Sequence, residues 1–443
     1  VPSGNSTITA WGSKQDGISF STMLGNINPP GSSKGFIAAS LSTAGPNYYY
    51  SWTRDSALVA RAITYKYSTS YQNDPKILGL LKDYVTYQVN EQTESTVCNC
   101  LGEPKFNPDG SSFSGPWGRP QNDGPAERAS TMILFAKSYY AQTNDVGYVS
   151  NTLKPAIYKD LDYIVNVWGN NCFDLWEEVN GVHFYTLMMM RHGLVQGSIF
   201  ANTLGDSTRA NTYKTAAQNI KNRIDTFWES GSNYIVVTQN QSAGVNKPSG
   251  LDVAVLLAAN QGGLGDGVYT PGSDKVLATA VALEKSFASL YPINKNLPSY
   301  YGTAIGRYPE DTYNGNGNSE ANPWFIATTT YAELYYRAIS EWTNGSGVTV
   351  NSINKEFFSK FDASATNGKV YTPGSDSFNS LVNNVAIAAD NFLSTVRYHQ
   401  TSNGSLSEQF NRYTGFMTGA RDLTWSHAAM VTALAAKAGT PSP

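Results

Sequence analysis

Cysteine, histidine and charged residues are scarce in this 443-residue sequence. It has three Cys and four His, and they lack the spacing of metal ligands, so a zinc site is not expected. Only 15% of the residues are charged and the net charge is -3, which leaves no basic surface for nucleic acid. The longest apolar run, 253–259, is far shorter than the ~20 residues that cross a bilayer. The sequence therefore predicts no cofactor and no nucleic-acid or membrane partner.

The pairing of the three cysteines stays open. Cys98 and Cys100 are one residue apart, so a bridge between them would close a strained small ring, and the sequence does not distinguish it from a bridge of either one to Cys172. At least one thiol is left over.

Several features favour a secreted glycoprotein. The sequence begins at Val1 without Met or an apolar leader, which predicts a mature form from which a signal peptide has been removed. Low charge and abundant Ser, Thr, Asn and Gly point the same way. The triplet that accepts N-glycans occurs at Asn5, Asn240, Asn344 and Asn403.

Apolar periodicity predicts an all-α protein of about twelve or thirteen helices. Asp74 and Pro75 have the pattern of an N-cap followed by a first-turn proline. The segment 234–238 is the clearest strand. Stripes at helical spacing cover 58–63, 77–85, 132–139, 157–168, 213–227, 276–290, 331–339 and 381–392.

Long loops between these helices carry Trp, Arg, Glu and Asp rather than the composition of linkers, which favours a functional role. They cover 99–124, 242–250, 261–274 and 299–323. Because no internal linker is visible before the tail-like 438–443, we expect a single domain over 1–443.

The stretch 171–181, NCFDLWEEVNG, holds two adjacent acids in an otherwise apolar setting. Desolvation and mutual repulsion would keep a proton on Glu177 or Glu178 near neutral pH, so that it can act as an acid. Glu408, in NGSLSEQF, is the best candidate for a distant partner. Glycoside hydrolysis uses such a pair. The alternative is that Glu-Glu is merely a solvated helix start.

Five loop-to-helix junctions combine aromatic residues with arginine or acids. Trp offers a stacking surface, and Arg and Asp offer fixed donors and acceptors for sugar hydroxyls. One junction alone would more readily be a structural Arg–Asp pair beside a buried Trp, but five together favour a carbohydrate site. The junctions read YYYSWTRD (48–55), GPWGRPQND (115–123), DLWEEVN (174–180), GRYPED (306–311) and GSLSEQF (404–410).

These segments, together with LGEPKFN, NPWF and ARDLTWS, resemble the fungal and yeast glucoamylases, glycoside hydrolase family 15, over roughly 35–435. The resemblance implies an (α/α)6 barrel, or toroid, of paired inner and outer helices with an active-site funnel and no metal. It also implies a secreted hydrolase of starch degradation that releases β-D-glucose from the non-reducing ends of starch and maltooligosaccharides with inversion. On this resemblance, 1–443 is expected to be a single catalytic domain, without the starch-binding domain that many relatives carry.

The resemblance also implies residue roles. Glu177 corresponds to the general acid and Glu408 to the general base. Arg54 and Asp55 would hold hydroxyls of the terminal glucose. The other residues that it assigns to substrate binding are Tyr48, Trp52, Trp117, Leu175, Trp176, Glu178, Arg307 and Trp425.

Two departures from the family pattern concern the base. Gly419 stands where mould enzymes have a serine that hydrogen-bonds the base, and Phe410 replaces a common tyrosine. A carboxylate with fewer donors keeps its proton to higher pH, so the acid limb of activity is expected at higher pH than in serine-bearing relatives.

Three other readings compete with this one. The first is another helical-barrel glycosidase, acting on trehalose or a different α-glucan. The second is a carbohydrate-binding protein without catalysis, against which the retention of both Glu177 and Glu408 argues. The third is a structural glycoprotein that binds no sugar. Nothing in the sequence suggests an obligate oligomer, so a monomer acting on soluble oligosaccharides is expected.

Overall fold

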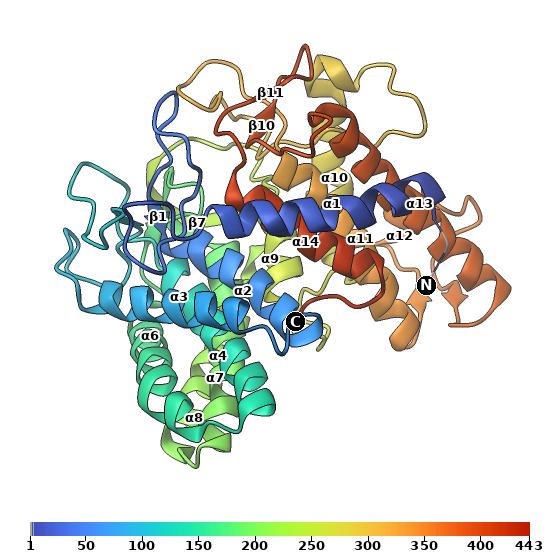
Figure 1. Ribbon diagram of the computed structural model, residues 1–443. Helices are drawn as coiled ribbons and strands as arrows, with labels where there is room; N and C mark the ends of the chain where they lie inside the picture. Colours follow the sequence, from blue (N-terminus) through green and yellow to red (C-terminus); the bar gives the residue numbers. More distant parts are fainter. Residues whose placement is uncertain (1, 3) are drawn as a thin grey trace. The chain divides into compact units, whose positions relative to one another are not determined.

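The computed structural model describes residues 2 and 4–443, most of which lie in helices (Figure 1). The longer helices are α1 (Ser6–Gly25), α2 (Thr53–Thr69), α3 (Pro75–Thr93), α4 (Asp123–Thr143), α6 (Lys154–Val167), α7 (Phe184–Thr203), α8 (Ser207–Ile224), α9 (Ala254–Gly262), α10 (Asp274–Leu290), α11 (Phe325–Asn344), α13 (Asp376–His399) and α14 (Thr424–Lys437). Short helical segments are α5 (Val146–Tyr148), η1 (Val149–Leu153), η2 (Asp225–Phe227), η3 (Pro292–Asn294) and α12 (Lys355–Ser359).

Strands are short, and all pairs between them are antiparallel. They are β1 (Ser51–Trp52), β2 (Lys105–Phe106), β3 (Cys172–Phe173), β4 (Val179–His183), β5 (Trp228–Glu229), β6 (Tyr234–Ile235), β7 (Thr238–Gly244), β8 (Val348–Thr349), β9 (Val370–Tyr371), β10 (Gln409–Phe410) and β11 (Met417–Thr418). β1 pairs with β2, β10 with β11, and β4 lies between β3 and β7.

The chain divides into two compact units, which we describe separately. The α4 unit comprises Ser21–Thr226, Thr238–Val245 and Pro443. The α11 unit comprises the residues before Ser21, Phe227–Val237 and Asn246–Ser442. The expectation of one catalytic domain over 1–443 remains a prediction.

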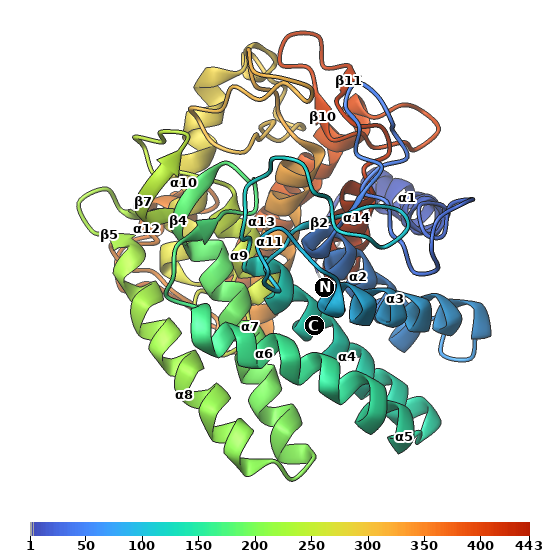
Figure 2. The same cartoon turned by 90° about the vertical axis from the view of Figure 1, so that its left-hand side faces the viewer.

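In the α4 unit, helix α4 packs against α2, α6 and α7, and α8 packs along α7 (Figure 2). Arg128 of α4 connects three helices of this unit, α3, α4 and α6. Its Nε and Nη2 donate to the two carboxylate oxygens of Asp160 on α6, at 2.8 and 2.7 Å, and Nη1 donates to Gln88 and Glu91 on α3, at 3.3 and 3.5 Å. All four side chains are buried. A planar guanidinium therefore satisfies acceptors from two neighbouring helices at once.

The α11 unit is built around helix α11, which packs against α9, α13 and α14. Its core is aromatic. Tyr331 and Tyr335 of α11 contact Phe392 of α13 with ring centroids 5.0 and 5.6 Å apart, and Phe357 of α12 meets Tyr335 edge-on at 5.4 Å. Such tilted and edge-to-face contacts are the arrangements that aromatic rings favour in a packed core.

The prediction of an all-α protein is confirmed, and each predicted stripe lies within or overlaps a helix. Asp74 caps α3 as expected, because its Oδ1 accepts from the backbone N–H of Lys76 and Ile77. The prediction of a strand over 234–238 was only partly right. β6 ends at Ile235 and Thr238 begins β7, which pairs elsewhere.

The structure answers the open question of the cysteines. Cys98 and Cys100 form a disulfide, and Cys172 is buried and free. No helix in the described part of the chain is long and apolar enough to cross a membrane.

Glu91 generates a stability prediction. Burial raises the pKa of its carboxyl to about 8, although Arg128 opposes the shift. A pKa above that of the unfolded chain means that the folded state binds the proton more tightly, so the stabilising contribution is complete below about pH 4.5 and is lost as pH rises through 8. We expect Glu91→Gln to unfold in urea with a free energy that falls less between pH 5 and 8 than that of the wild type, by at least about 1 kcal/mol. Glu94→Gln, at the exposed end of the same helix, is the control, and equal pH slopes for the wild type and Glu91→Gln would contradict the prediction.

Candidate active site

In the α4 unit, a tight loop at 174–179 presents the two adjacent glutamates. Its two ends are joined by the Asp174 N–H, which donates to the Val179 carbonyl at 3.0 Å. The Asp174 carboxylate fills the inside of the loop, with Oδ1 accepting from the backbone N–H of Glu178 at 2.8 Å and of Val179 at 3.0 Å. Glu177 adopts φ 69°, a left-handed conformation that few non-glycine residues hold. The loop therefore imposes the direction of the Glu177 side chain.

Three N–H donors converge on one oxygen of Glu177. Trp52 Nε1 donates to Oε2 at 2.9 Å and Gln121 Nε2 at 2.8 Å, and Trp117 Nε1 donates to the same atom. Within the described part of the chain, no donor is directed at Oε1. Oε2 is thus held as an acceptor, and a proton on this carboxyl belongs on Oε1.

Gln121 was not predicted from the sequence as a site residue. Its amide bridges two residues that were, because Oε1 accepts from Arg54 Nη1 at 3.0 Å while Nε2 donates to Glu177. Asp174 was also missed. The only available signal was that both lie inside the junctions, GPWGRPQND and DLWEEVN, that the sequence singles out.

The predicted aromatic residues of this unit form a wall beside Glu177. The rings of Tyr48 and Trp52 have centroids 5.9 Å apart, and those of Trp52 and Trp117 are 6.2 Å apart. Trp117 is 38% exposed, so its ring is open to a ligand. Leu175 and Trp176 are buried, consistent with their expected contribution through main-chain groups.

Lys105 lies behind this wall in a cage of aromatic rings. Its Nζ is 3.6 Å from the ring centre of Trp117 and 5.2 Å from that of Trp52; it is also 4.1 Å from Tyr50 and 3.9 Å from Phe113. β1–β2 pairing explains the position, since Lys105 is the register partner of Trp52. Burial lowers the pKa of Lys105 to about 8; the negative charge of Glu177 acts to raise it and Arg119 acts to lower it. Sequence reasoning missed this cation.

Arg54 and Asp55 begin helix α2 and are both buried. The Arg54 guanidinium contacts Asp55 at 3.5 Å and Asp123 at 3.3 Å. Burial raises the pKa of Asp55 to about 6, a shift that Arg54 opposes and Glu177 reinforces. Arg54 and Asp55 thus both interact electrostatically with the Glu177 carboxyl. Their expected role in holding hydroxyls of a terminal glucose stays a prediction.

In the α11 unit, Glu408 lies at the start of the β10 hairpin and is 2% exposed. Its N–H donates to the Ala420 carbonyl at 2.9 Å, and its Oε1 accepts from Gln409 Nε2 at 2.7 Å. Gly419 lies directly against it. A Cβ at that position would be 3.3 Å from Glu408 Oε1. The sequence correctly paired this glycine with the expected base.

Trp324, of the NPWF segment, connects Glu408 to Arg307. The backbone of Trp324 bridges to Gln409 and donates to Ile305, and its ring centre is 5.2 Å from the Arg307 guanidinium. Arg307 forms a bidentate pair with Asp311, at 2.7 and 2.8 Å. The predicted Trp425 is buried in the first turn of α14. Trp324 therefore links the junctions GRYPED and GSLSEQF in this unit.

Phe410, which replaces a common tyrosine, has an aromatic environment. Its ring stacks on His399 with centroids 4.5 Å apart and contacts Phe325 at 4.8 Å. Among the described residues, no group of three or more His, Cys, Asp or Glu has the geometry of a metal site.

A carboxyl group held by N–H donors beside an open aromatic wall fits the needs of glycoside hydrolysis, which uses carboxyl groups and a surface on which sugar rings can stack. Sequence comparison agrees, because the profile of glycosyl hydrolases family 15 matches residues 17–435. The chain belongs to this family.

Curated relatives are fungal glucoamylases. The chain is 66% identical over 441 residues to "Glucoamylase 1" of Rhizopus oryzae, and the alignment covers 100% of this chain and 73% of that protein. It is 34% identical over 450 residues to "Glucoamylase" of Blastobotrys adeninivorans, and that alignment covers 97% of this chain and 72% of the relative.

Solved structures agree. The glycoside hydrolase family 15 glucoamylase from Hypocrea jecorina has a TM-score of 0.91 at 35% identity, covering 98% of this chain and 73% of that one. The glucoamylase from Saccharomycopsis fibuligera has a TM-score of 0.90 at 31% identity, covering 98% and 96%. The predicted fold class, the (α/α)6 fold of these enzymes, is confirmed.

The caged lysine generates a prediction for the pH profile. Its positive charge favours the ionised form of Glu177, so without it the carboxyl would hold its proton to higher pH. If Glu177 is the acid, Lys105→Met moves the alkaline limb of kcat/KM for maltotriose upward by about half a pH unit or more.

Lys82→Met is the matched control, because Lys82 Nζ also lies over two rings, those of Tyr139 and Tyr148 at 4.9 and 4.7 Å. It is expected to leave the limb in place. An unmoved or lowered limb in Lys105→Met would show that the caged charge does not act on the acid.

Proposed function

We propose that this chain is a glucoamylase, an exo-acting enzyme that releases β-D-glucose from the non-reducing ends of starch and maltooligosaccharides by an inverting acid/base mechanism. The observation that carries the proposal is the 66% identity over the whole chain to the Rhizopus oryzae glucoamylase. The arrangement around Glu177 supports it independently.

In this mechanism Glu177 is the general acid. Its Oε2 is occupied by three N–H donors, so Oε1 carries the proton and delivers it to the glycosidic oxygen as the bond to the anomeric carbon breaks. The leaving sugar departs as an alcohol. Trp52, Trp117 and Gln121 then stabilise the carboxylate that remains, because N–H bonds to an oxygen strengthen as its charge grows.

Glu408 is the general base. It takes a proton from a water molecule, whose oxygen attacks the anomeric carbon from the face opposite the leaving group and inverts it. Buried surroundings suit this role, since a carboxylate removed from bulk water is a stronger base. The donor on Gln409 orients it.

The remaining predicted residues bind sugar. Arg54 and Asp55 hold hydroxyls of the terminal glucose, and Glu178 and Arg307 bind sugar around the bond that is cleaved. The Asp311 carboxylate holds the Arg307 guanidinium in one orientation. Tyr48, Trp52, Trp117 and Trp425 supply stacking surfaces, and Leu175 and Trp176 contribute main-chain groups.

We also propose that the enzyme is a secreted, N-glycosylated monomer that acts on soluble glucans. Three sequons support glycosylation, because Asn240, Asn344 and Asn403 are all exposed. A non-catalytic sugar-binding protein of the same family is the main alternative.

Proton NMR of maltotriose during its first minutes with the enzyme tests the mechanism. We expect the β-anomer of glucose to appear first and Glu177→Gln and Glu408→Gln to lower kcat by at least about 1,000-fold each with the fold unchanged. Early α-glucose would refute inversion. Full turnover in both variants would refute the assignment of acid and base, and saturable binding without glucose would favour the non-catalytic alternative.

Gly419 allows the acid limb to be tested. A serine there could donate to Glu408 Oε1 from close range, which would favour the carboxylate, so Gly419→Ser is expected to move the acid limb of kcat/KM to lower pH. The backbone at 419 has φ 77°, so any side chain costs about 1–2 kcal/mol of stability.

Gly419→Ala separates the two effects, because it carries the same backbone strain without a hydroxyl. A limb that moves equally in both variants, or in neither, would exclude the hydrogen bond as the cause.

A further inference from the structure

In the α11 unit, a series of three hydrogen bonds leads from a backbone N–H group to the carboxylate of the proposed base. Asn322 Oδ1 accepts from the backbone N–H of Arg412 at 3.0 Å, and Asn322 Nδ2 donates to Gln409 Oε1 at 3.1 Å. Gln409 Nε2 then donates to Glu408 Oε1 at 2.7 Å. The side chains of Asn322, Gln409 and Glu408 are all buried. We call this series the Asn322 relay.

The first bond of the Asn322 relay determines the direction of the others. A backbone N–H can only donate, so Asn322 turns its amide oxygen toward Arg412 and its NH2 group toward Gln409. Gln409 must then turn its oxygen toward Asn322, which leaves its own NH2 group facing Glu408. Turning either amide by 180° would set donors against donors and acceptors against acceptors, which is unfavourable in a buried site.

Main-chain bonds fix the position of Asn322 relative to the base. The segment that follows Asn322 runs antiparallel to β10. The Phe410 N–H donates to the Pro323 carbonyl at 3.1 Å, and the Phe325 N–H donates to the Glu408 carbonyl at 3.2 Å. A replacement of the Asn322 side chain would therefore leave the backbone of Glu408 in place and change the bonds that lead to its carboxylate.

We propose that Asn322 is a positioning residue for the general base, because it keeps the NH2 side of the Gln409 amide against Glu408. The proposal rests on the proposed function, in which Glu408 takes a proton from the attacking water. An N–H donor stabilises the ionised carboxylate that accepts this proton, whereas an amide oxygen in its place would favour the protonated form, which is not a base. Asn322 acts on catalysis through Gln409.

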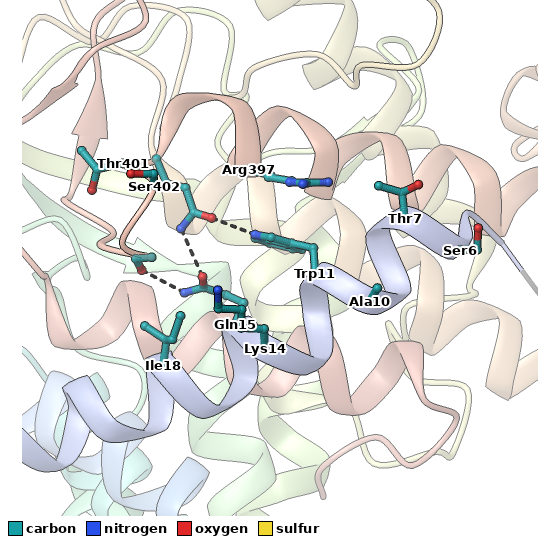
Figure 3. Close-up of a pocket in the computed structure, with 12 residues that line it drawn as sticks. Ser6, Thr7, Ala10, Trp11, Lys14, Gln15, Ile18, Arg397, Thr401 and Ser402 are labelled. Carbon is teal, nitrogen blue, oxygen red and sulfur yellow. Dashed lines mark hydrogen bonds between the residues drawn. The ribbon is translucent and has the colours of Figure 1, made fainter.

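The same unit contains a second series of amide hydrogen bonds, which supports backbone (Figure 3). Trp11 Nε1 donates to Gln400 Oε1 at 2.9 Å, and Gln400 Nε2 donates to Gln15 Oε1 at 3.3 Å. Gln15, which is 1% exposed, donates in turn to the Gly404 carbonyl at 3.0 Å. Gln15 thus holds the backbone of the segment that leads to the base, and a change there is a matched control for a purely structural effect.

The test compares Asn322→Leu with Gln15→Leu, because each replaces a buried amide by an apolar side chain of similar size. The donor on Gln409 acts on the base during the reaction, so we expect Asn322→Leu to lower kcat for maltotriose about five- to tenfold with KM unchanged. Gln15→Leu should leave kcat and KM within about twofold of the wild type. If Asn322→Leu does not yield folded protein, Asn322→Ala gives the same comparison with less bulk beside Gln409.

A double-mutant cycle tests whether Asn322 acts through Gln409. Gln409→Met removes the donor to Glu408 and lowers kcat by itself. In that background Asn322→Leu is expected to lower kcat by less than about twofold more. Losses that multiply in the double variant would overturn the proposal, because Asn322 would then act independently of the Gln409 amide. An unchanged kcat in Asn322→Leu, or an equal loss in Gln15→Leu, would also overturn it.

α-Glucosyl fluoride separates this proposal from the proposed function. Fluoride leaves without being protonated, so its hydrolysis needs the base and not the acid. We expect Asn322→Leu to lower kcat for this substrate and for maltotriose by the same factor. A loss confined to maltotriose would overturn the role at the base and leave the proposed function standing. A wild type that hydrolyses neither substrate would instead refute the function.

Discussion

Three N–H groups directed at a single oxygen of Glu177 are the interaction on which the α4 unit's site depends. They come from separate parts of the sequence, since Trp52 is in β1 and Trp117 and Gln121 are in the loop before α4. Pairing of β1 with β2 and the start of α4 hold these donors in place. Because they saturate Oε2, the two oxygens of one carboxyl become chemically different before any substrate binds. Such preorganisation removes the need to reorient dipoles during the reaction.

Burial of several acids around Arg54 would be costly if all of them were charged. Burial raises the pKa of Asp55 to about 6 and that of Glu127 well above its ordinary value, so these carboxyls take up protons more readily. The positive charges of Arg54 and the caged Lys105 both interact with Glu177. A cation that contacts aromatic faces is stabilised without a carboxylate partner. Lys105 can therefore act on Glu177 at a distance without forming an ion pair that would occupy it.

The sequence identified the candidate residues that stand in recognisable motifs. It did not identify those whose role depends on where the fold places them. Glu177, Trp117 and Gly419 were recognisable within motifs. Gln121, Asp174 and Lys105 were not, because an amide, a turn acid and a lysine acquire their roles only through partners that folding brings together. Helix α7 was not predicted from the sequence, for a different reason. All of 184–194 is buried, so its mainly apolar residues are not confined to one face and show no periodic stripe.

In the proposed mechanism the adjacent acids Glu177 and Glu178 have different tasks, and the left-handed backbone at Glu177 accounts for the difference. Consecutive side chains also point apart in a regular strand. In this turn they do so while the N–H groups of Glu177 and Glu178 both donate to Asp174, to its carbonyl and to its carboxylate. The end of the turn is packed against β7, where a Cβ at Gly244 would approach the Glu178 carbonyl to 2.0 Å. Glycine at 177 would remove the strain of about 1 kcal/mol but would also remove the carboxyl. The fold therefore accepts an unfavourable backbone conformation at Glu177, because that conformation directs the Glu177 side chain toward the three donors.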